Sequence, residues 1–88
     1  MSISQHISAV ADKYTLTTEV VEGILTGALL RGAVESFGEG GLTVSLTEGD
    51  VEVRAGLTLI PPHRYTPKGI RRVRAELHKG LQGAKHGK

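Results

Sequence analysis

The chain lacks cysteine and tryptophan, and it has few aromatic residues of any kind. Among its 88 residues there are no cysteines, two tyrosines and one phenylalanine. Without cysteine, neither a disulfide nor a thiolate metal site can reinforce so short a chain. So few rings predict an aliphatic core and no platform on which the bases of a single strand could stack. Because a chain of this length buries only a modest part of its surface, we expect association with another copy to stabilise it.

Long apolar runs and a targeting segment are also missing. The most apolar stretch, residues 20–34, contains Glu22 and Arg31. It falls short of the roughly 20 residues that a membrane-spanning helix needs. The first six residues contain no basic region followed by an apolar run, and so predict no signal peptide. We therefore expect a cytoplasmic protein with no membrane association.

Residue types that catalyse reactions or bind metals occur without the spacing that such chemistry requires. The carboxylates Glu48, Asp50 and Glu52 surround an expected turn, which is typical of a solvated hairpin tip. Residues 38–41 are rich in glycine but lack the lysine and the preceding strand of a phosphate-binding loop. The four histidines show no metal-ligand spacing; they are His6, His63, His78 and His86. The pattern predicts no enzyme, no metal site and no cofactor.

Positive charge is concentrated at one end of the chain. Residues 63–88 contain eight lysines and arginines against the single acid Glu76, whereas residues 1–62 contain three against eight acids. The net charge of +2 conceals this split. An acidic body with a basic end favours a partner that carries phosphate groups, or an acidic protein surface.

Two helices are expected in the first half of the chain. Ser2 with Gln5 fits a capping box, and apolar residues recur at helical spacing over residues 3–14. Thr17 is the expected N-cap of a second helix over residues 18–37. That helix is apolar on more than one side, so we expect its extra face to contact another copy of the chain. The residues expected at this contact are Val21, Leu25, Ala28, Leu29 and Phe37.

Glycines interrupt this second helix, and two interpretations stay open. Gly23, Gly27 and Gly32 each cost about 1 kcal/mol relative to alanine in a helix interior. Either a neighbouring helix approaches their backbone closely and offsets that cost, or the helix is simply weak.

The second half of the chain predicts a small antiparallel sheet. Residues 42–46 alternate between apolar and polar, which is typical of a half-buried strand, and residues 47–50 form a turn. Residues 51–59 predict either one long strand or two strands joined near Gly56. Two prolines at 61 and 62 end this region.

A basic helix is expected after the sheet. Thr66-Pro67 is a strong helix start, and Gly80 and Gly83 are expected to end the helix. We expect a single domain over residues 1–81 and a flexible basic tail over residues 82–88. The order of helix, helix, strands and helix predicts the α+β class.

Four short motifs, in order along the chain, resemble one known family. Residues 10–17 (Val-Ala-Asp-Lys-Tyr-Thr-Leu-Thr) resemble the end of its first helix, the turn and the start of its second helix. Residues 38–44 and 51–54 resemble its glycine-rich start of the sheet and its second strand. Residues 65–69 (Tyr-Thr-Pro-Lys-Gly) are similar to the aromatic-x-Pro-Gly-Lys sequence that opens its last helix. The family is that of HU and integration host factor, bacterial DNA-binding proteins, and the resemblance implies an intertwined homodimer.

The departures from that family concern DNA bending. Its members carry a long basic β-arm tipped by a proline, and here only residues 55–62 separate the second strand from the start of the last helix. Residues 47–50 replace its Phe-Gly-x-Phe hairpin, and Pro67-Lys68-Gly69 changes its Pro-Gly-Lys order. Inserted wedges generate such kinks, so an armless variant with a missing or very short arm predicts little bending.

The basic end predicts sequence-independent binding to the phosphates of double-stranded DNA, with RNA as an alternative, by an HU-like homodimer. The helix start would add backbone N–H groups as a phosphate site. Two alternatives stay open: the charged face is simply solvated, or the HU-like body has lost DNA binding and docks on an acidic protein partner. In the DNA-binding interpretation the protein associates with the nucleoid. The residues expected to contact nucleic acid are Arg54, His63, Arg64, Lys68, Arg71, Arg72, Arg74, Lys79, Lys85 and Lys88.

Overall fold

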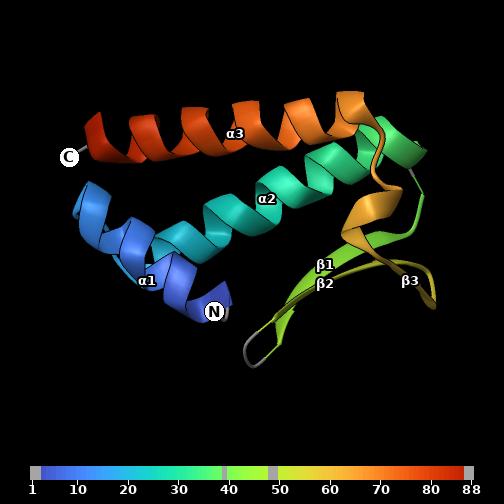
Figure 1. Ribbon diagram of the computed structural model, residues 1–88, viewed down its shortest axis with the longest axis horizontal. Helices are drawn as coiled ribbons and strands as arrows, with labels where there is room; N and C mark the ends of the chain where they lie inside the picture. The colour runs from blue at the N-terminus through green and yellow to red at the C-terminus, as the bar shows by residue number, and fades with distance from the viewer. Residues whose placement is uncertain (1–2, 39, 48–49, 87–88) are drawn as a thin grey trace.

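The computed structural model describes residues 3–38, 40–47 and 50–86. Its elements follow the expected order, and the α+β class with a three-stranded antiparallel sheet is confirmed (Figure 1). No helix in these ranges is long and apolar enough to cross a membrane. The elements are α1 (Ile3–Tyr14), α2 (Thr18–Phe37), β1 (Leu42–Thr47), β2 (Asp50–Ala55), β3 (Thr58–Ile60), the 3-10 helix η1 (Pro62–Arg64) and α3 (Pro67–His86).

Local signals set the bounds of the first two helices as predicted. The side chain of Thr17 accepts a hydrogen bond from the Val20 N–H at 3.3 Å, which confirms it as the N-cap of α2. At the end of α1, the Leu16 N–H bonds to the Ala11 carbonyl at 2.8 Å. Thr15 lies between the helices in the left-handed region, with φ 58°, where glycine is usual. Ser2, the expected cap of α1, lies outside the described residues.

The sheet has the order β1-β2-β3, and each neighbouring pair is antiparallel. Val53 pairs with Val44 on one side and with Ile60 on the other. Of the two alternatives for residues 51–59, two strands are confirmed, and they are joined by Gly56 and Leu57 alone. Gly56 has φ 63°, which permits so tight a turn. A turn of two residues leaves no β-arm. The turn residues 48 and 49 lie outside the described residues.

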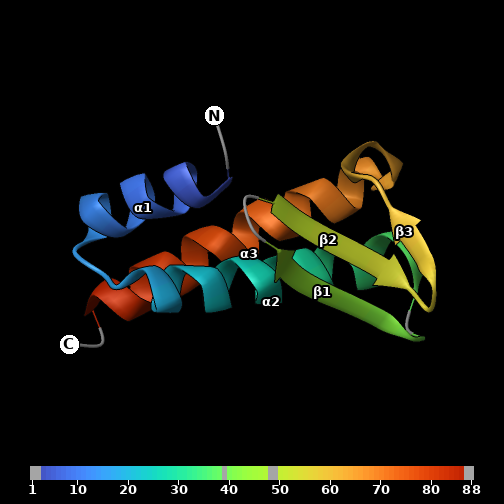
Figure 2. The same ribbon diagram turned by 90° about the horizontal axis from the view of Figure 1, so that it is seen from below.

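Helix α2 is the centre of the molecule. Helix α3 runs antiparallel along one side of it, and α1 and the sheet lie on the other side (Figures 1 and 2). One core cluster joins α2 to the sheet and α3, and a second joins α1 to α2. Both clusters are small and aliphatic apart from Tyr65, as the composition predicts. Their buried members are Ala28, Ala33, Val53, Tyr65 and Val73 in the first, and Ile7, Ala11 and Val21 in the second.

Helices α2 and α3 approach each other closely through glycine. A Cβ atom on Gly32 would collide with the Val73 side chain and lie 2.9 Å from the Gly69 carbonyl. A Cβ on Gly80 would lie 2.6 Å from Cγ2 of Ile24. The close-approach interpretation is therefore confirmed for Gly32. It is not supported within one chain for Gly23 and Gly27, since a Cβ there would meet nothing within 4 Å.

Tyr65 anchors the segment between the sheet and α3. Its hydroxyl donates a hydrogen bond to the Leu29 carbonyl at 2.9 Å, and its ring packs edge-on against Phe37 at 5.8 Å between centroids. Burial raises the pKa of the Tyr65 phenol above its usual value. Thr66 accepts a hydrogen bond from the Gly69 N–H at 3.0 Å, which confirms the predicted N-cap of α3.

One prediction about the helices needs correction. The end of α3 expected at Gly80 or Gly83 is wrong, because the helix continues to His86. Packing overrides the local glycine signal: Gly80 fits against Ile24, and Leu81 packs on the core between α1 and α2. The division of the chain at residue 82 stays a prediction.

The residues expected at a contact with another copy are largely used inside the chain. Val21 and Ala28 are only 4% and 2% exposed, and Leu25 and Leu29 pack against the two cores. Phe37 alone among these five is exposed, at 44%. The contact of these five residues with another copy stays a prediction.

Candidate nucleic-acid interface

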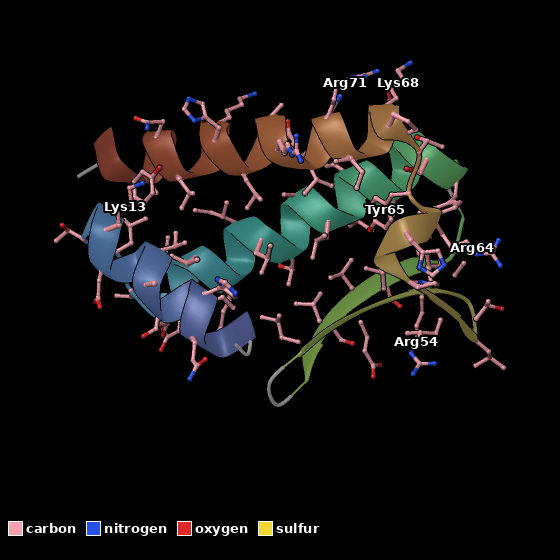
Figure 3. All side chains as sticks on the ribbon, viewed as in Figure 1. Lys13, Arg54, Arg64, Tyr65, Lys68 and Arg71 are labelled. Atoms are coloured by element: carbon pink, nitrogen blue, oxygen red, sulfur yellow. The ribbon has the colours of Figure 1, made fainter. Side chains whose placement is uncertain are left out.

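The candidate interface is the outer face of α3, the face turned away from α2. Gly69, Val73 and Leu77 occupy the inner face and pack against α2 or its core. Consecutive residues of an α-helix are rotated by about 100° around its axis. The charged residues between these three therefore lie on the outer face of the helix. Lys68 and Arg71 point outward from this face in Figure 3.

The outer arc is long as well as charged. Lys68, Arg71 and Lys79 are exposed and fall within about 80° of the helix circumference, counted at about 100° per residue. Arg74 lies about 60° beyond Arg71 on one side, and Arg72 lies about 20° beyond Lys79 on the other. From Lys68 to Lys79 the helix rises about 16 Å at 1.5 Å per residue. We call these five cations the basic face.

Two members of the basic face already have carboxylate partners. Lys68 Nζ lies 3.3 Å from Glu35 Oε1, and Arg72 Nε lies 3.6 Å from Glu76 Oε2. Glu76 is also held by Arg31 of α2 at 3.1 Å. Ion pairs between side chains this exposed contribute about 0–1 kcal/mol each, so a phosphate could replace either carboxylate at small cost.

The other three members are exposed cations without a carboxylate partner in the described part of the chain. Arg71, Arg74 and Lys79 are exposed, and none of them is in an ion pair among the residues that the structure describes. Their long side chains can bring a charged group to a phosphate while the helix backbone stays in place. These three residues are therefore the strongest candidates for contact with a polyanion.

Several residues expected at the same interface lie elsewhere. Arg54 projects from the sheet on the side of the molecule opposite Arg71, and Arg64 lies at the end formed by η1 (Figure 3). Arg54 is paired with Glu52 at 3.1 Å. His63 is exposed beside Arg64 in η1. Arg54 therefore lies away from the basic face, and its contact with nucleic acid stays a prediction.

The contacts expected of the tail residues stay a prediction, and the expected phosphate site at the helix start has few free N–H groups. Lys85 falls within α3, but its side chain, like the whole of Lys88, lies outside the described residues. At the helix start Pro67 has no N–H, and the Gly69 N–H is taken by Thr66. The N–H groups that a phosphate needs are therefore mostly occupied.

One ion pair of the site has no signal in the sequence, and another has one. Glu35 lies 33 positions before Lys68, so no local pattern predicts their pairing. The Arg72–Glu76 pair does have a signal, because the two residues are four positions apart in a helix. In the described ranges, no group of histidines and carboxylates is arranged to hold a metal ion.

Comparison with protein-family models, with curated proteins and with solved structures found no match to this chain. The fold, the basic face and the short motifs in the sequence are therefore the features that point to a function.

Proposed function

We propose that this protein binds double-stranded nucleic acid without sequence preference, through the basic face of α3. The observation that carries the proposal is the set of three exposed cations, Arg71, Arg74 and Lys79, that have no acidic partner among the described residues. Each such cation that meets a phosphate releases condensed counterions, and this gain does not depend on base sequence. The short motifs and the order of elements support an HU-like architecture for the protein.

A duplex fits the surface better than a single strand does. Binding of single strands relies on aromatic side chains that stack on bases. Tyr65 is buried, Phe37 is 44% exposed with its ring edge-on to Tyr65, and the basic face itself has no aromatic member. The basic face is instead a straight ridge on one helix, which suits the regular rows of phosphates along a double helix. With a turn of two residues in place of an arm, the protein should bend the duplex little.

The proposal is tested by comparing two variants that remove the same charge from different places. Arg71→Gln with Arg74→Gln removes two cations from the basic face. Lys13→Gln with Arg54→Gln removes two from α1 and from the outer side of the sheet. Each protein is titrated into labelled duplexes of about 30 base pairs and of unrelated sequence, at about 50 and about 200 mM salt, and binding is followed by fluorescence anisotropy.

The basic-face variant should bind all duplexes more weakly and should respond less to salt. Losing two phosphate contacts lowers the slope of log affinity against log salt by about 1.8. Over a fourfold rise in salt the wild type should therefore lose about 12-fold more affinity than this variant. The Lys13/Arg54 variant should keep the wild-type slope. If the two variants behave alike, the contacts do not lie on α3.

A protein partner with an acidic surface is the second candidate. Lys68 and Arg72 already bind the carboxylates of Glu35 and Glu76, so the face accommodates such groups. The missing arm also removes a feature that DNA bending requires. Absence of any duplex binding at about 50 mM salt would favour this candidate over the first, since non-specific DNA binding is strongest at low salt.

A further inference from the structure

The turn between β2 and β3 carries a leucine that the fold does not use. This two-residue turn requires glycine at its first position, where Gly56 has φ 63°, but it requires no apolar residue at the second. Turn positions are usually polar. The second position is nevertheless Leu57, which is 96% exposed and does not pack on either core cluster.

A second exposed leucine lies next to this turn. Leu59 of β3 is 51% exposed and pairs directly with Arg54 of β2, so the two side chains lie on the same side of the sheet. Leu57 and Leu59 are the most exposed large apolar residues in the described part of the chain. We call these two residues the leucine tip. Exposed apolar residues that are scattered singly are ordinary, whereas two neighbouring ones at a turn indicate a contact site.

The leucine tip lies at one end of the molecule. In both ribbon views the turn between β2 and β3 is at the extremity of the long axis (Figures 1 and 2). The turn is fixed to the rest of the protein, because the Gly56 N–H donates a hydrogen bond to the Gly41 carbonyl at 2.9 Å. The leucines can therefore enter an apolar medium while the fold stays as it is.

Positive charge lies at the same end as the leucine tip. Arg54 and Arg64 are both at this end, and Arg64 points away from the body of the molecule (Figure 3). Arg64 and its neighbour His63 are exposed, and neither is in an ion pair among the described residues. Arg54 is paired with Glu52, so Arg64 is the cation most able to meet an anion outside the chain. None of these residues belongs to the basic face.

Apolar side chains beside cations match the surface of a membrane that contains anionic lipids. Such a surface has hydrocarbon just beneath a layer of negative head groups, so both kinds of side chain gain from one contact. The phosphates of a nucleic acid would bind the cations but would leave the leucines in water unless two base pairs separated to admit them. An acidic protein would cover the leucines only if it had a pocket of matching shape.

We propose that the leucine tip and Arg64 dock this protein on the surface of membranes that contain anionic phospholipids. Leu57 enters the boundary between head groups and acyl chains, and Arg64 binds the negative head groups. The expectation of no membrane association rests on the lack of a spanning segment, which docking at a surface does not require. The contact forms without nucleic acid, so the proposal stands or falls independently of the proposed function.

The first test places a single tryptophan at one of two surfaces, because the natural chain has none. Leu57→Trp puts the indole at the leucine tip, and Ala75→Trp puts it at an exposed position of α3, four residues after Arg71. Phosphatidylcholine vesicles with about 30% phosphatidylserine are added, up to about 1 mM lipid, without nucleic acid. The fluorescence of Leu57→Trp should shift to the blue as the indole leaves water, and that of Ala75→Trp should not shift. A shift in Ala75→Trp alone would show adsorption on the basic face and overturn the proposal.

The second test measures cosedimentation with the same vesicles for variants that have no added ring. Leu57→Gln should weaken binding about 10-fold or more, the worth of burying one leucine. Arg64→Gln should weaken it about fivefold. Leu30→Gln is the matched control for the leucine, because it removes an exposed leucine from α2. Lys13→Gln is the control for charge, because Lys13 lies at the opposite end of the molecule (Figure 3). Both controls should bind as the wild type does.

Circular dichroism checks that Leu57→Gln keeps the wild-type fold, which is expected because Leu57 packs on neither core cluster. A folded Leu57→Gln variant that binds vesicles as tightly as the wild type would overturn the proposal. The same variant is also titrated into a labelled duplex. Weaker duplex binding with unchanged vesicle binding would mean that the leucine tip contacts nucleic acid and not lipid.

Discussion

Replacing Gly69 with alanine should destabilise the protein, although alanine is the better helix former. A Cβ on Gly69 would collide with the Ser36 hydroxyl and lie 2.8 Å from the Gly32 carbonyl. The Gly32 carbonyl is part of the α2 backbone, so it can move away only if the two helices separate. Ser36 cannot easily rotate either, because it accepts a hydrogen bond from the Thr66 N–H at 3.1 Å and lies 3.3 Å from the Thr66 hydroxyl.

The expected magnitude follows from three contributions. Overpacking a close contact costs about 1–3 kcal/mol. Displacing the Ser36 hydroxyl from its bond to Thr66 costs about 1 kcal/mol. Replacing glycine by alanine within a helix gains about 1 kcal/mol. The net free energy of unfolding should therefore fall by about 1–3 kcal/mol, and each 1 kcal/mol lowers Tm by roughly 4–8 °C in a domain of this size.

Gly83→Ala is the matched control. Gly83 is in the same helix, and a Cβ there meets nothing within 4 Å, so alanine should stabilise the protein by about 1 kcal/mol. Urea denaturation followed by circular dichroism, at one fixed protein concentration, measures both variants. They should differ by about 2–4 kcal/mol, with the wild type between them. A Gly69→Ala variant as stable as Gly83→Ala would refute the close packing of α2 on α3.

Three further substitutions can be checked in the same denaturation assay. Thr15→Gly should stabilise the protein by about 1–2 kcal/mol, because Thr15 has φ 58° and glycine adopts that conformation without strain. Tyr65→Phe should cost about 1 kcal/mol by removing the bond to the Leu29 carbonyl. Burial raises the pKa of Tyr65, so wild-type stability should decline as pH rises above about 10, and this decline should be smaller in Tyr65→Phe. Leu57→Ser should change stability by less than about 0.5 kcal/mol, since Leu57 is 96% exposed; a larger loss would mean that this turn is covered.

The sequence predicted those parts of the fold that depend on neighbouring residues. Thr17 and Thr66 cap the helices that follow them because a cap bonds to an N–H only three positions away. Strand pairing was predicted where the alternation of apolar residues is regular, as from Leu42 to Leu46. The end of α3 was not predicted correctly. In the sequence Gly80 is a helix-ending signal, but in the structure it lies inside the helix and packs closely against Ile24.

In the candidate site, too, local features can be predicted from the sequence and contacts between distant residues cannot. The concentration of charge in α3 is visible in the sequence, and so is the outward arc of Lys68, Arg71 and Lys79. The sequence does not show which of these cations forms an ion pair, because the partner of Lys68 comes from another helix. Arg54 is a similar case, since a cation in β2 cannot be placed relative to α3 until the sheet is placed.

The three glycines of α2 look alike in the sequence but have different surroundings in the structure. The helix is apolar around most of its circumference, and α3 covers one side while α1 and the sheet cover another. Gly32 lies on a covered side, where the missing Cβ admits α3, whereas a Cβ at Gly23 or Gly27 would meet nothing within 4 Å. In sequence all three are the same residue at helical spacing. What separates them is contact with a helix more than 30 positions further along the chain, which no local pattern shows.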